Sequence, residues 1–94
     1  MDLGSTIRKL RKEKGMKLKD VARKAGLSNN GLCSIEKNYC FPTQKNFYAI
    51  CDAIGVPHYI VLAECVTIDD VPPEKREAFN LLWPPIMKYL KGDK

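Results

Sequence analysis

The sequence predicts an all-α fold from three observations. Apolar residues recur at helical spacing in five segments of the first 64 residues. Gly15, Gly26 and Gly55 follow three of these segments, at positions where glycine commonly ends a helix. A further apolar stripe near the C-terminus continues the helical spacing beyond a proline-containing connection. We therefore expect five helices followed by one or two extra C-terminal helices.

The first helix is expected over residues 5–14. Leu3, Ile7 and Leu10 form its apolar stripe, and basic residues occupy most of its other faces. Gly15 comes directly after this segment and is a suitable end for the helix.

Two short helices joined by a tight turn are expected within residues 18–37, and the rest of the chain is organised around them. Gly26 stands where the first helix needs a left-handed final residue. Ser28 stands where the next helix needs a side-chain acceptor for its free N–H groups. Ala22 is small where the two helices must approach each other. This spacing matches a helix-turn-helix, whose second helix enters the major groove of DNA.

The fourth and fifth helices follow a loop at residues 38–42. Thr43 can cap the fourth helix, whose core stripe includes Phe47 and Ile50, and Cys51 is expected in the same core. Pro57 suits the first turn of a fifth helix reaching residue 64. Residues 59–62 of this helix are all apolar or aromatic, so it needs cover on more than one side. His58 is expected to be half-buried.

The C-terminal segment lies outside this arrangement, so we divide the chain at residues 1–65 and 66–94. Pro84 and Pro85 are expected to kink its helix or to divide it in two. The segment either folds onto its own domain or forms a dimer contact together with the fifth helix, and we favour the dimer. The residues expected at that interface are Tyr59, Ile60, Phe79, Leu82, Trp83, Ile86, Met87 and Leu90.

The run from about residue 5 to residue 64 resembles the lambda-repressor-like helix-turn-helix domain, also called the XRE family. The resemblance implies a five-helix DNA-binding domain. It rests on landmarks that occur in the family's order and spacing: Ile7, Leu10, Arg11, Gly15, Val21, Ala22, Ala25, Gly26, Leu27, Ser28, Leu32, Ile35, Glu36, Pro42, Ala53, Ile54, Gly55 and Val56.

The resemblance also implies a structural bridge between Arg11 and Glu36. A guanidinium and a carboxylate can form two parallel hydrogen bonds, which would tie the first helix to the third. The alternative is a loose surface pair that contributes little to stability. The chain departs from the family at Leu18, where members usually carry a glutamine that contacts a phosphate. Lys17 and Lys19 can supply charge there instead.

The third helix is expected to read bases. Leu32 and Ile35 face the core, which leaves a short outer face that is uncharged until its end. Asparagine can bond both N6 and N7 of adenine, although an Asn near a helix start can also serve only the helix. The residues expected to contact bases are Asn29, Asn30, Cys33 and Ser34.

Positive charge accompanies this motif. Residues 1–45 carry eleven Lys/Arg and four Asp/Glu, a net +7, whereas residues 46–94 carry five and seven, a net −2. The positive field therefore lies on the part of the chain with the motif, as expected for a partner with a phosphate backbone. The residues expected to contact phosphates are Lys17, Lys19, Ser28, Lys37, Asn38, Thr43 and Lys45. Tyr39 and Phe41 either pack on the core or lean on a sugar-phosphate strand.

Composition excludes several other classes of protein. The chain is 45% apolar and 29% charged, as in globular domains, and no apolar run approaches the roughly 20 residues that span a bilayer. Its start does not resemble a signal peptide, so we expect a cytoplasmic protein. Cys33, Cys40, Cys51, Cys65 and His58 do not have the spacing of metal ligands, so no metal or other cofactor is expected. No catalytic constellation occurs, so an enzyme is not expected.

Two functions remain open. The first is a sequence-specific transcriptional regulator, expected to be a dimeric repressor of double-stranded DNA. The second is an antitoxin-type interaction module that binds a toxin-like protein through the apolar C-terminal segment, and the resemblance makes the two compatible.

Overall fold

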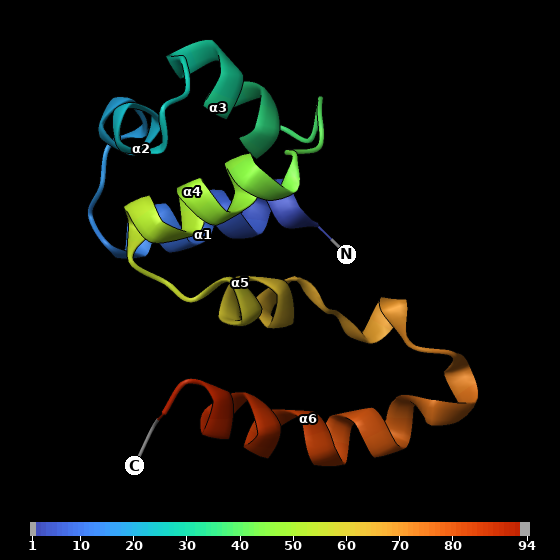
Figure 1. Cartoon of the computed structure of the whole chain (residues 1–94). Helices are drawn as coiled ribbons and strands as arrows, with labels where there is room; N and C mark the ends of the chain where they lie inside the picture. The colour runs from blue at the N-terminus through green and yellow to red at the C-terminus, as the bar shows by residue number, and fades with distance from the viewer. Residues whose placement is uncertain (1, 93–94) are drawn as a thin grey trace.

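The computed structural model describes residues 2–92. Within this range the chain contains six α-helices and two short 3-10 turns, and no strand (Figure 1). The helices are α1 Leu3–Glu13, α2 Leu18–Ala25, α3 Asn29–Glu36, α4 Gln44–Ile54, α5 His58–Cys65 and α6 Arg76–Leu90. The turns are η1 Ile68–Asp70 and η2 Pro73–Lys75. The predicted all-α fold, with five helices and an extra C-terminal helix, is confirmed.

The helix ends follow from local chemistry. Gly26 and Gly55 adopt left-handed conformations after α2 and α4, with φ of 73° and 84°. Ser28 caps α3 by accepting a hydrogen bond from Gly31 N at 2.9 Å, and Thr43 caps α4 by accepting one from Asn46 N at 3.1 Å. Helix α1 begins two residues earlier than expected because the Asp2 side chain accepts a hydrogen bond from the Ser5 backbone N–H.

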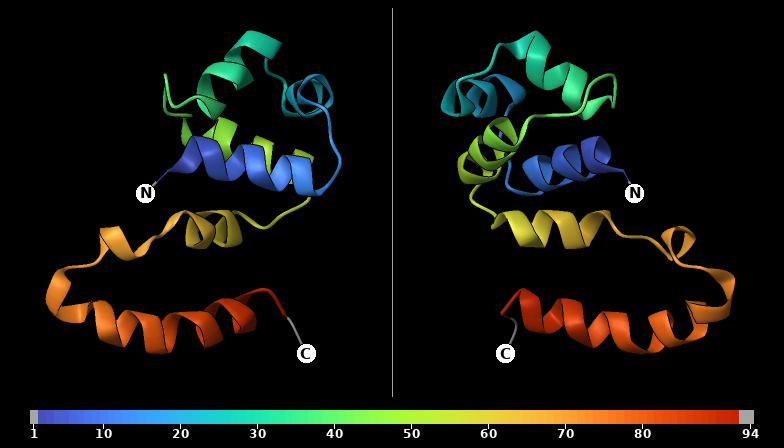
Figure 2. Two further views of the ribbon diagram at one scale, coloured as in Figure 1. Left: turned by 180° about the vertical axis from the view of Figure 1, so that it is seen from behind. Right: turned by 45° about the vertical axis from the view of Figure 1, so that its right-hand side comes forward.

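Helices α1, α2, α3, α4 and α5 share one hydrophobic core. Ile7, Val21, Leu32 and Ile50 are each no more than 1% exposed, and Cys51 is 2% exposed as expected for a core residue. Helix α4 packs against α2 and α5, while α1 packs against α3 and α5. The two views in Figure 2 show α1 and α4 side by side beneath the α2–α3 pair. This arrangement holds α2 and α3 on one side of the domain, and α5 on the opposite side.

Helix α6 leaves this core and returns alongside α5 (Figures 1 and 2). It packs mainly on η1 and η2, and none of its residues is buried. It runs through Pro84 and Pro85 as one helix, so the expected division in two does not occur. The two prolines lack the N–H groups that would bond the carbonyls of Asn80 and Leu81, but both of those residues are exposed and can be hydrated.

The fifth helix differs from expectation at His58. This residue is exposed and not half-buried, and its ring lies 4.6 Å from the ring of Tyr48 and 5.9 Å from that of Tyr59. As the first residue of α5 it lies before the turn that packs on the core, so the neighbouring apolar residues do not enclose it. Tyr59 and Leu62 also stay exposed, at 51% and 39%.

Within residues 2–92, no single helix is long and apolar enough to cross a membrane. Helices α4 and α5 reach that length and composition only when taken together, across a bend of 100°.

Candidate nucleic-acid interface

The candidate interface is built on α3. Leu32 and Ile35 are buried, at 0% and 5% exposed, so they fix which face of the helix points inward. Asn29 and Asn30 are exposed in its first turn, where each carries amide donor and acceptor groups. Among the residues expected to contact bases, these two are the most accessible.

Cys33 and Ser34 are only partly exposed. Cys33 lies in a shallow groove of about 170 Å³ with Leu18, Arg8 and Lys37. Ser34 lies one turn beyond Asn30, and its backbone carbonyl accepts a hydrogen bond from Tyr39 N at 2.9 Å. Both side chains therefore have less freedom to reach a base than the two asparagines have, and their role stays a prediction.

The lysines expected to contact phosphates lie at the ends of α2, α3 and α4. Lys17 and Lys19 lie at the start of α2, Lys37 directly follows α3, and Lys45 lies in the first turn of α4; all four are exposed. They carry no acidic partner among the ion pairs of residues 2–92. Four cationic side chains thus stand at the starts of α2 and α4 and at the end of α3.

Ser28 and Thr43 each use the side-chain oxygen to cap a helix. A hydroxyl that accepts one hydrogen bond still has its own O–H to donate. Each can therefore cap its helix and donate to a phosphate oxygen at a helix N-terminus, where the helix dipole also favours an anion.

Leu18 stands where family members usually carry a glutamine, and its apolar side chain cannot make the hydrogen bond of that glutamine to a phosphate. It is partly buried and packs against the core cluster. The start of α2 is consequently fixed by apolar packing, and Lys17 and Lys19 are the groups there that can attract a phosphate.

Arg11 and Glu36 form the bidentate pair that the resemblance implied. Arg11 Nε lies 2.8 Å from Glu36 Oε2, and Arg11 Nη2 lies 3.0 Å from Glu36 Oε1. Arg11 Nη1 also donates to Met16 O at 2.9 Å. The two residues are 8% and 6% exposed, so this is a buried pair and not a loose surface contact. The hydrogen bonds to Glu36 raise the pKa of Arg11 above its ordinary value.

A second junction between α1 and α3 escaped the sequence analysis. Asn38 has φ of 63°, and its side chain turns back to α1. Its Oδ1 accepts a hydrogen bond from Gly4 N at 3.0 Å, and its Nδ2 donates to Asp2 Oδ1 at 2.7 Å. The bonds from the Ser5 N–H and the Asn38 amide lower the pKa of Asp2.

This junction changes the interpretation of Asn38. Its side chain is already committed within the chain, so its predicted phosphate contact would have to come from remaining hydrogen-bonding capacity or from the backbone. The sequence held one weak signal of the junction, a glycine at position 4 beside the expected first helix. The structure places Gly4 inside α1, where its lack of a side chain permits close approach of the α3 backbone.

Comparison with known proteins is consistent with this geometry. A family model described as a helix-turn-helix domain matches residues 4–64. The chain belongs to the XRE-type helix-turn-helix family of DNA-binding regulators. The matched part of this XRE-type chain contains α1 to α5 except for Leu3, which begins α1, and Cys65, which ends α5. It excludes η1, η2 and α6.

Two relatives of this family member are informative. The chain is 35% identical over 71 residues to the uncharacterized HTH-type transcriptional regulator y4dJ of Sinorhizobium fredii, covering 76% of this chain and 87% of that protein. The crystal structure of a tyrosine-to-alanine mutant of the restriction-modification controller protein C.Esp1396I matches with a TM-score of 0.64 and 28% identity. That match covers 67% of this chain and 82% of the controller protein.

Within residues 2–92, no cluster of three or more His, Cys, Asp or Glu side chains could hold a metal ion. Cys51 and Cys65 are buried, Cys33 is partly exposed and Cys40 is exposed, and all four are free thiols. Burial raises the pKa of Cys51 to about 11 and also raises that of Cys65, whose thiol donates to Val61 O at 3.1 Å. Both buried thiols are therefore packing groups.

Proposed function

We propose that this chain is a sequence-specific regulator of transcription that reads the major groove of double-stranded DNA with α3. The observation that carries the proposal is the exposure of Asn29 and Asn30 at the start of a helix whose other end is held by the buried Arg11–Glu36 pair. The exposed lysines around α3 supply sequence-independent attraction, while the asparagines supply discrimination. The proposal concerns DNA binding alone and includes no catalytic step.

Selection of binding sites from random duplex DNA with the purified protein tests this proposal. We expect one motif to be enriched, with adenines where Asn29 and Asn30 reach base edges. Repeating the selection with the Asn29→Ala/Asn30→Ala variant is the matched control, because both positions are exposed and the fold should be unaffected. Absence of any enriched motif with the wild-type chain would contradict the proposal.

We further propose that the chain acts as a homodimeric repressor that blocks access to its operator. Two reading helices spaced by about one turn of DNA would read paired half-sites. The apolar surface of α6 supports a dimer: Leu82 is 56% exposed and Ile86 is 44% exposed, while Trp83 is only partly covered. A self-complementary contact would bury this surface.

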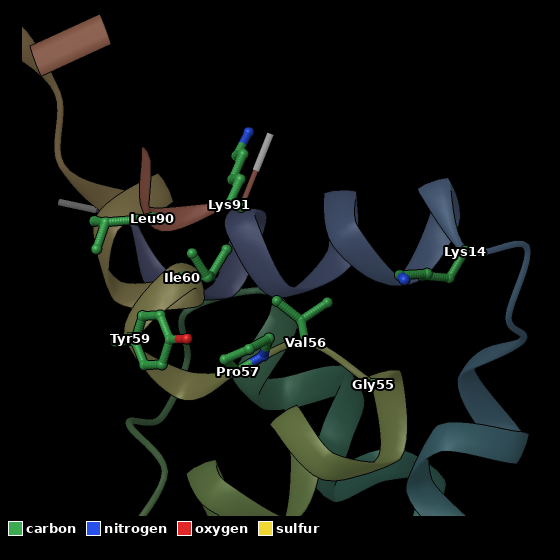
Figure 3. A pocket seen from close by; sticks show the side chains of 9 residues that line it. Lys14, Gly55, Val56, Pro57, Tyr59, Ile60, Leu90 and Lys91 are labelled. Carbon is green, nitrogen blue, oxygen red and sulfur yellow. The ribbon is translucent and has the colours of Figure 1, made fainter. Parts of the chain in front are cut away.

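The alternative, in which the C-terminal segment folds onto its own domain, also has support. Lys91 at the end of α6 pairs with Glu64 on α5, and Lys9 Nζ on α1 lies 3.8 Å from Glu64 Oε2. However, α6 does not close onto α5. A pocket of about 360 Å³ remains between Leu90 and Lys91 on one side and Pro57, Tyr59 and Ile60 on the other (Figure 3).

Ile60 is the member of the predicted interface with the least surface to offer, because it is 7% exposed within its own chain. Phe79 and Trp83 stack on each other with ring centroids 5.3 Å apart, so they can present one combined aromatic surface. A partner copy would therefore meet mainly Tyr59 of α5 and the stripe on α6.

Sedimentation of the full chain and of a variant ending at Val66 tests the dimer. The truncation keeps Cys65, which is 1% exposed and belongs to the core. We expect the full chain to sediment as a dimer at tens of micromolar and the folded truncation as a monomer. A monomeric full chain would contradict the dimer, and an unfolded truncation would favour α6 as a cover for α5.

An antitoxin-type module remains the second candidate, since exposed apolar residues on α6 also suit a protein partner. Leu81 and Tyr89 are 75% and 83% exposed and lie off the stripe expected at the dimer contact. If the full chain dimerises through the stripe and still captures a toxin-like protein encoded beside its gene, both activities are present.

A further inference from the structure

The loop between α3 and α4 exposes two large aromatic side chains. Tyr39 and Phe41 are each 77% exposed, so the packing alternative considered from the sequence is wrong. Lys37 Nζ lies 6.0 Å from the centre of the Tyr39 ring, which places a cation over that ring. Two large aromatic side chains exposed to water beside α3 indicate an interaction site.

The loop is fixed at its start and at its end. Tyr39 N donates to Ser34 O at 2.9 Å, and the left-handed Asn38 is anchored to α1 through Asp2 and Gly4. At the other end, the Thr43 cap begins α4. The loop stands out from the body beside the C-terminal end of α3 (Figures 1 and 2). The backbone at both ends of the loop is therefore held in place before a partner binds, which lowers the entropic cost of ordering the loop.

The charge around these rings selects the partner. Residues 37–51 contain Lys37 and Lys45 and no Asp or Glu. The two lysines flank the aromatic pair in the sequence, and both are exposed. Asp2 is an acidic side chain close to this loop, and its carboxylate accepts a hydrogen bond from the Asn38 amide at 2.7 Å. Two exposed lysines beside two apolar rings suit a polyanion that also offers apolar surface. Duplex DNA meets both conditions, because its deoxyribose groups present C–H faces between phosphates.

We infer that Tyr39 and Phe41 lie against the deoxyribose groups of the DNA strand whose phosphates Lys37 and Lys45 contact. This inference rests on the proposed function and adds two contact residues to it. The lysine contacts release counterions, so their contribution falls as salt rises. Burial of the rings removes apolar surface from water, and salt does not screen that contribution. The two kinds of contact can therefore be separated by experiment.

The test measures affinity for the selected duplex over a range of salt concentrations. The variants are Tyr39→Ser, Phe41→Ser and their combination in the full chain. We expect each single change to weaken binding by about fivefold, because partial burial of an aromatic side chain is lost, and to do so at every salt concentration. The slope of log affinity against log salt should stay that of the wild type. Random duplex should lose affinity to the same degree, since sugars carry no sequence information.

Two matched controls accompany these variants. Tyr89→Ser removes an equally exposed aromatic from α6, and we expect wild-type affinity. Lys45→Ala removes a flanking charge, and we expect the salt slope to become shallower by about 1 per protomer, which is about 2 for the proposed dimer. The melting temperatures of the loop variants should match the wild type because both rings are in solvent.

Wild-type affinity in the double loop variant would overturn the inference while leaving the proposed function intact. A changed salt slope in the loop variants would also overturn it, since the rings would then act by positioning the lysines. If the wild-type chain bound no duplex DNA, the proposed function itself would fail.

Discussion

At the scale of single residues, the proposed base reading depends most on Asn29 and Asn30. Replacing either with alanine should weaken binding to the preferred site by about 1–3 kcal/mol, because one paired base contact is lost. Affinity for random duplex should change little. Lys37→Ala provides the contrast, because we expect it to weaken binding to the preferred site and to random duplex by about the same factor. Equal losses on both kinds of DNA for the Asn variants would mean that these residues serve only the helix start.

The buried ion pair gives a second prediction at this scale. Arg11→Ala should destabilise the fold by about 3–5 kcal/mol, because it leaves the Glu36 carboxylate buried without its partner. Thermal unfolding measures the effect, and Lys12→Ala, an exposed neighbour on the same helix, is the control. An unchanged melting temperature for Arg11→Ala would contradict the role of this pair.

The buried thiol of Cys51 makes the stability of the fold depend on pH. Its pKa is raised from 9.0 to about 11 by burial, so the native state holds the thiol proton more tightly than the unfolded chain does. The resulting stability is present below pH 9.0 and is lost as the pH rises toward 11. Melting temperatures across this window should fall more steeply in the wild type than in Cys51→Ala. Parallel curves would show that other groups cause the alkaline loss.

At the scale of elements, the end of α3 depends on close contact with α1. A Cβ added at Gly4 would lie 2.4 Å from Ile35 O and 2.7 Å from Glu36 O, both backbone atoms of α3. Gly4→Ala should therefore push the helices apart, lowering both the melting temperature and the affinity for DNA. Ser5→Ala, at an exposed position on the same helix, should preserve both. A Gly4→Ala variant with wild-type DNA affinity would show that α3 keeps its position without this contact.

Sequence reasoning predicted the elements whose causes are local. The glycine after α2 and the serine before α3 act through neighbouring backbone groups, so their roles follow from a few adjacent letters. It missed the bonds of Asn38 to Asp2 and Gly4, which join residues more than thirty positions apart. It also expected His58 to be half-buried, because hydrophobic spacing alone does not tell which turn of α5 meets the core.

The C-terminal segment shows the same limit. Its apolar stripe predicted a helix, and Pro84 and Pro85 predicted either a kink in that helix or its division in two. The helix is not divided, and Asn80 and Leu81, whose carbonyls lack donors, are exposed residues that water can reach. Their exposure depends on where α6 lies relative to the domain. No local pattern carries that information.

At the scale of the whole molecule, charge and shape are divided between two ends. The net +7 of residues 1–45 accompanies the α2–α3 pair, whereas α5 and α6 on the opposite side carry most of the exposed large apolar side chains outside the Tyr39–Phe41 loop. One end is thus suited to a polyanion and the other to a second copy. In the proposed dimer, this division would leave both copies of α3 uncovered.

Sequence-specific DNA binding is tested most directly by the affinity of the full chain for its selected duplex and for a scrambled duplex, measured over a range of salt concentrations. In the proposed dimer, phosphate contacts from Lys17, Lys19, Lys37 and Lys45 of each protomer would give log affinity against log salt a slope of about −7, because each contact contributes about −0.9. We predict this steep slope together with binding to the selected site at least about a thousandfold tighter than to the scrambled one. Binding that ignores salt, or that is equal for the two sequences, would contradict the account.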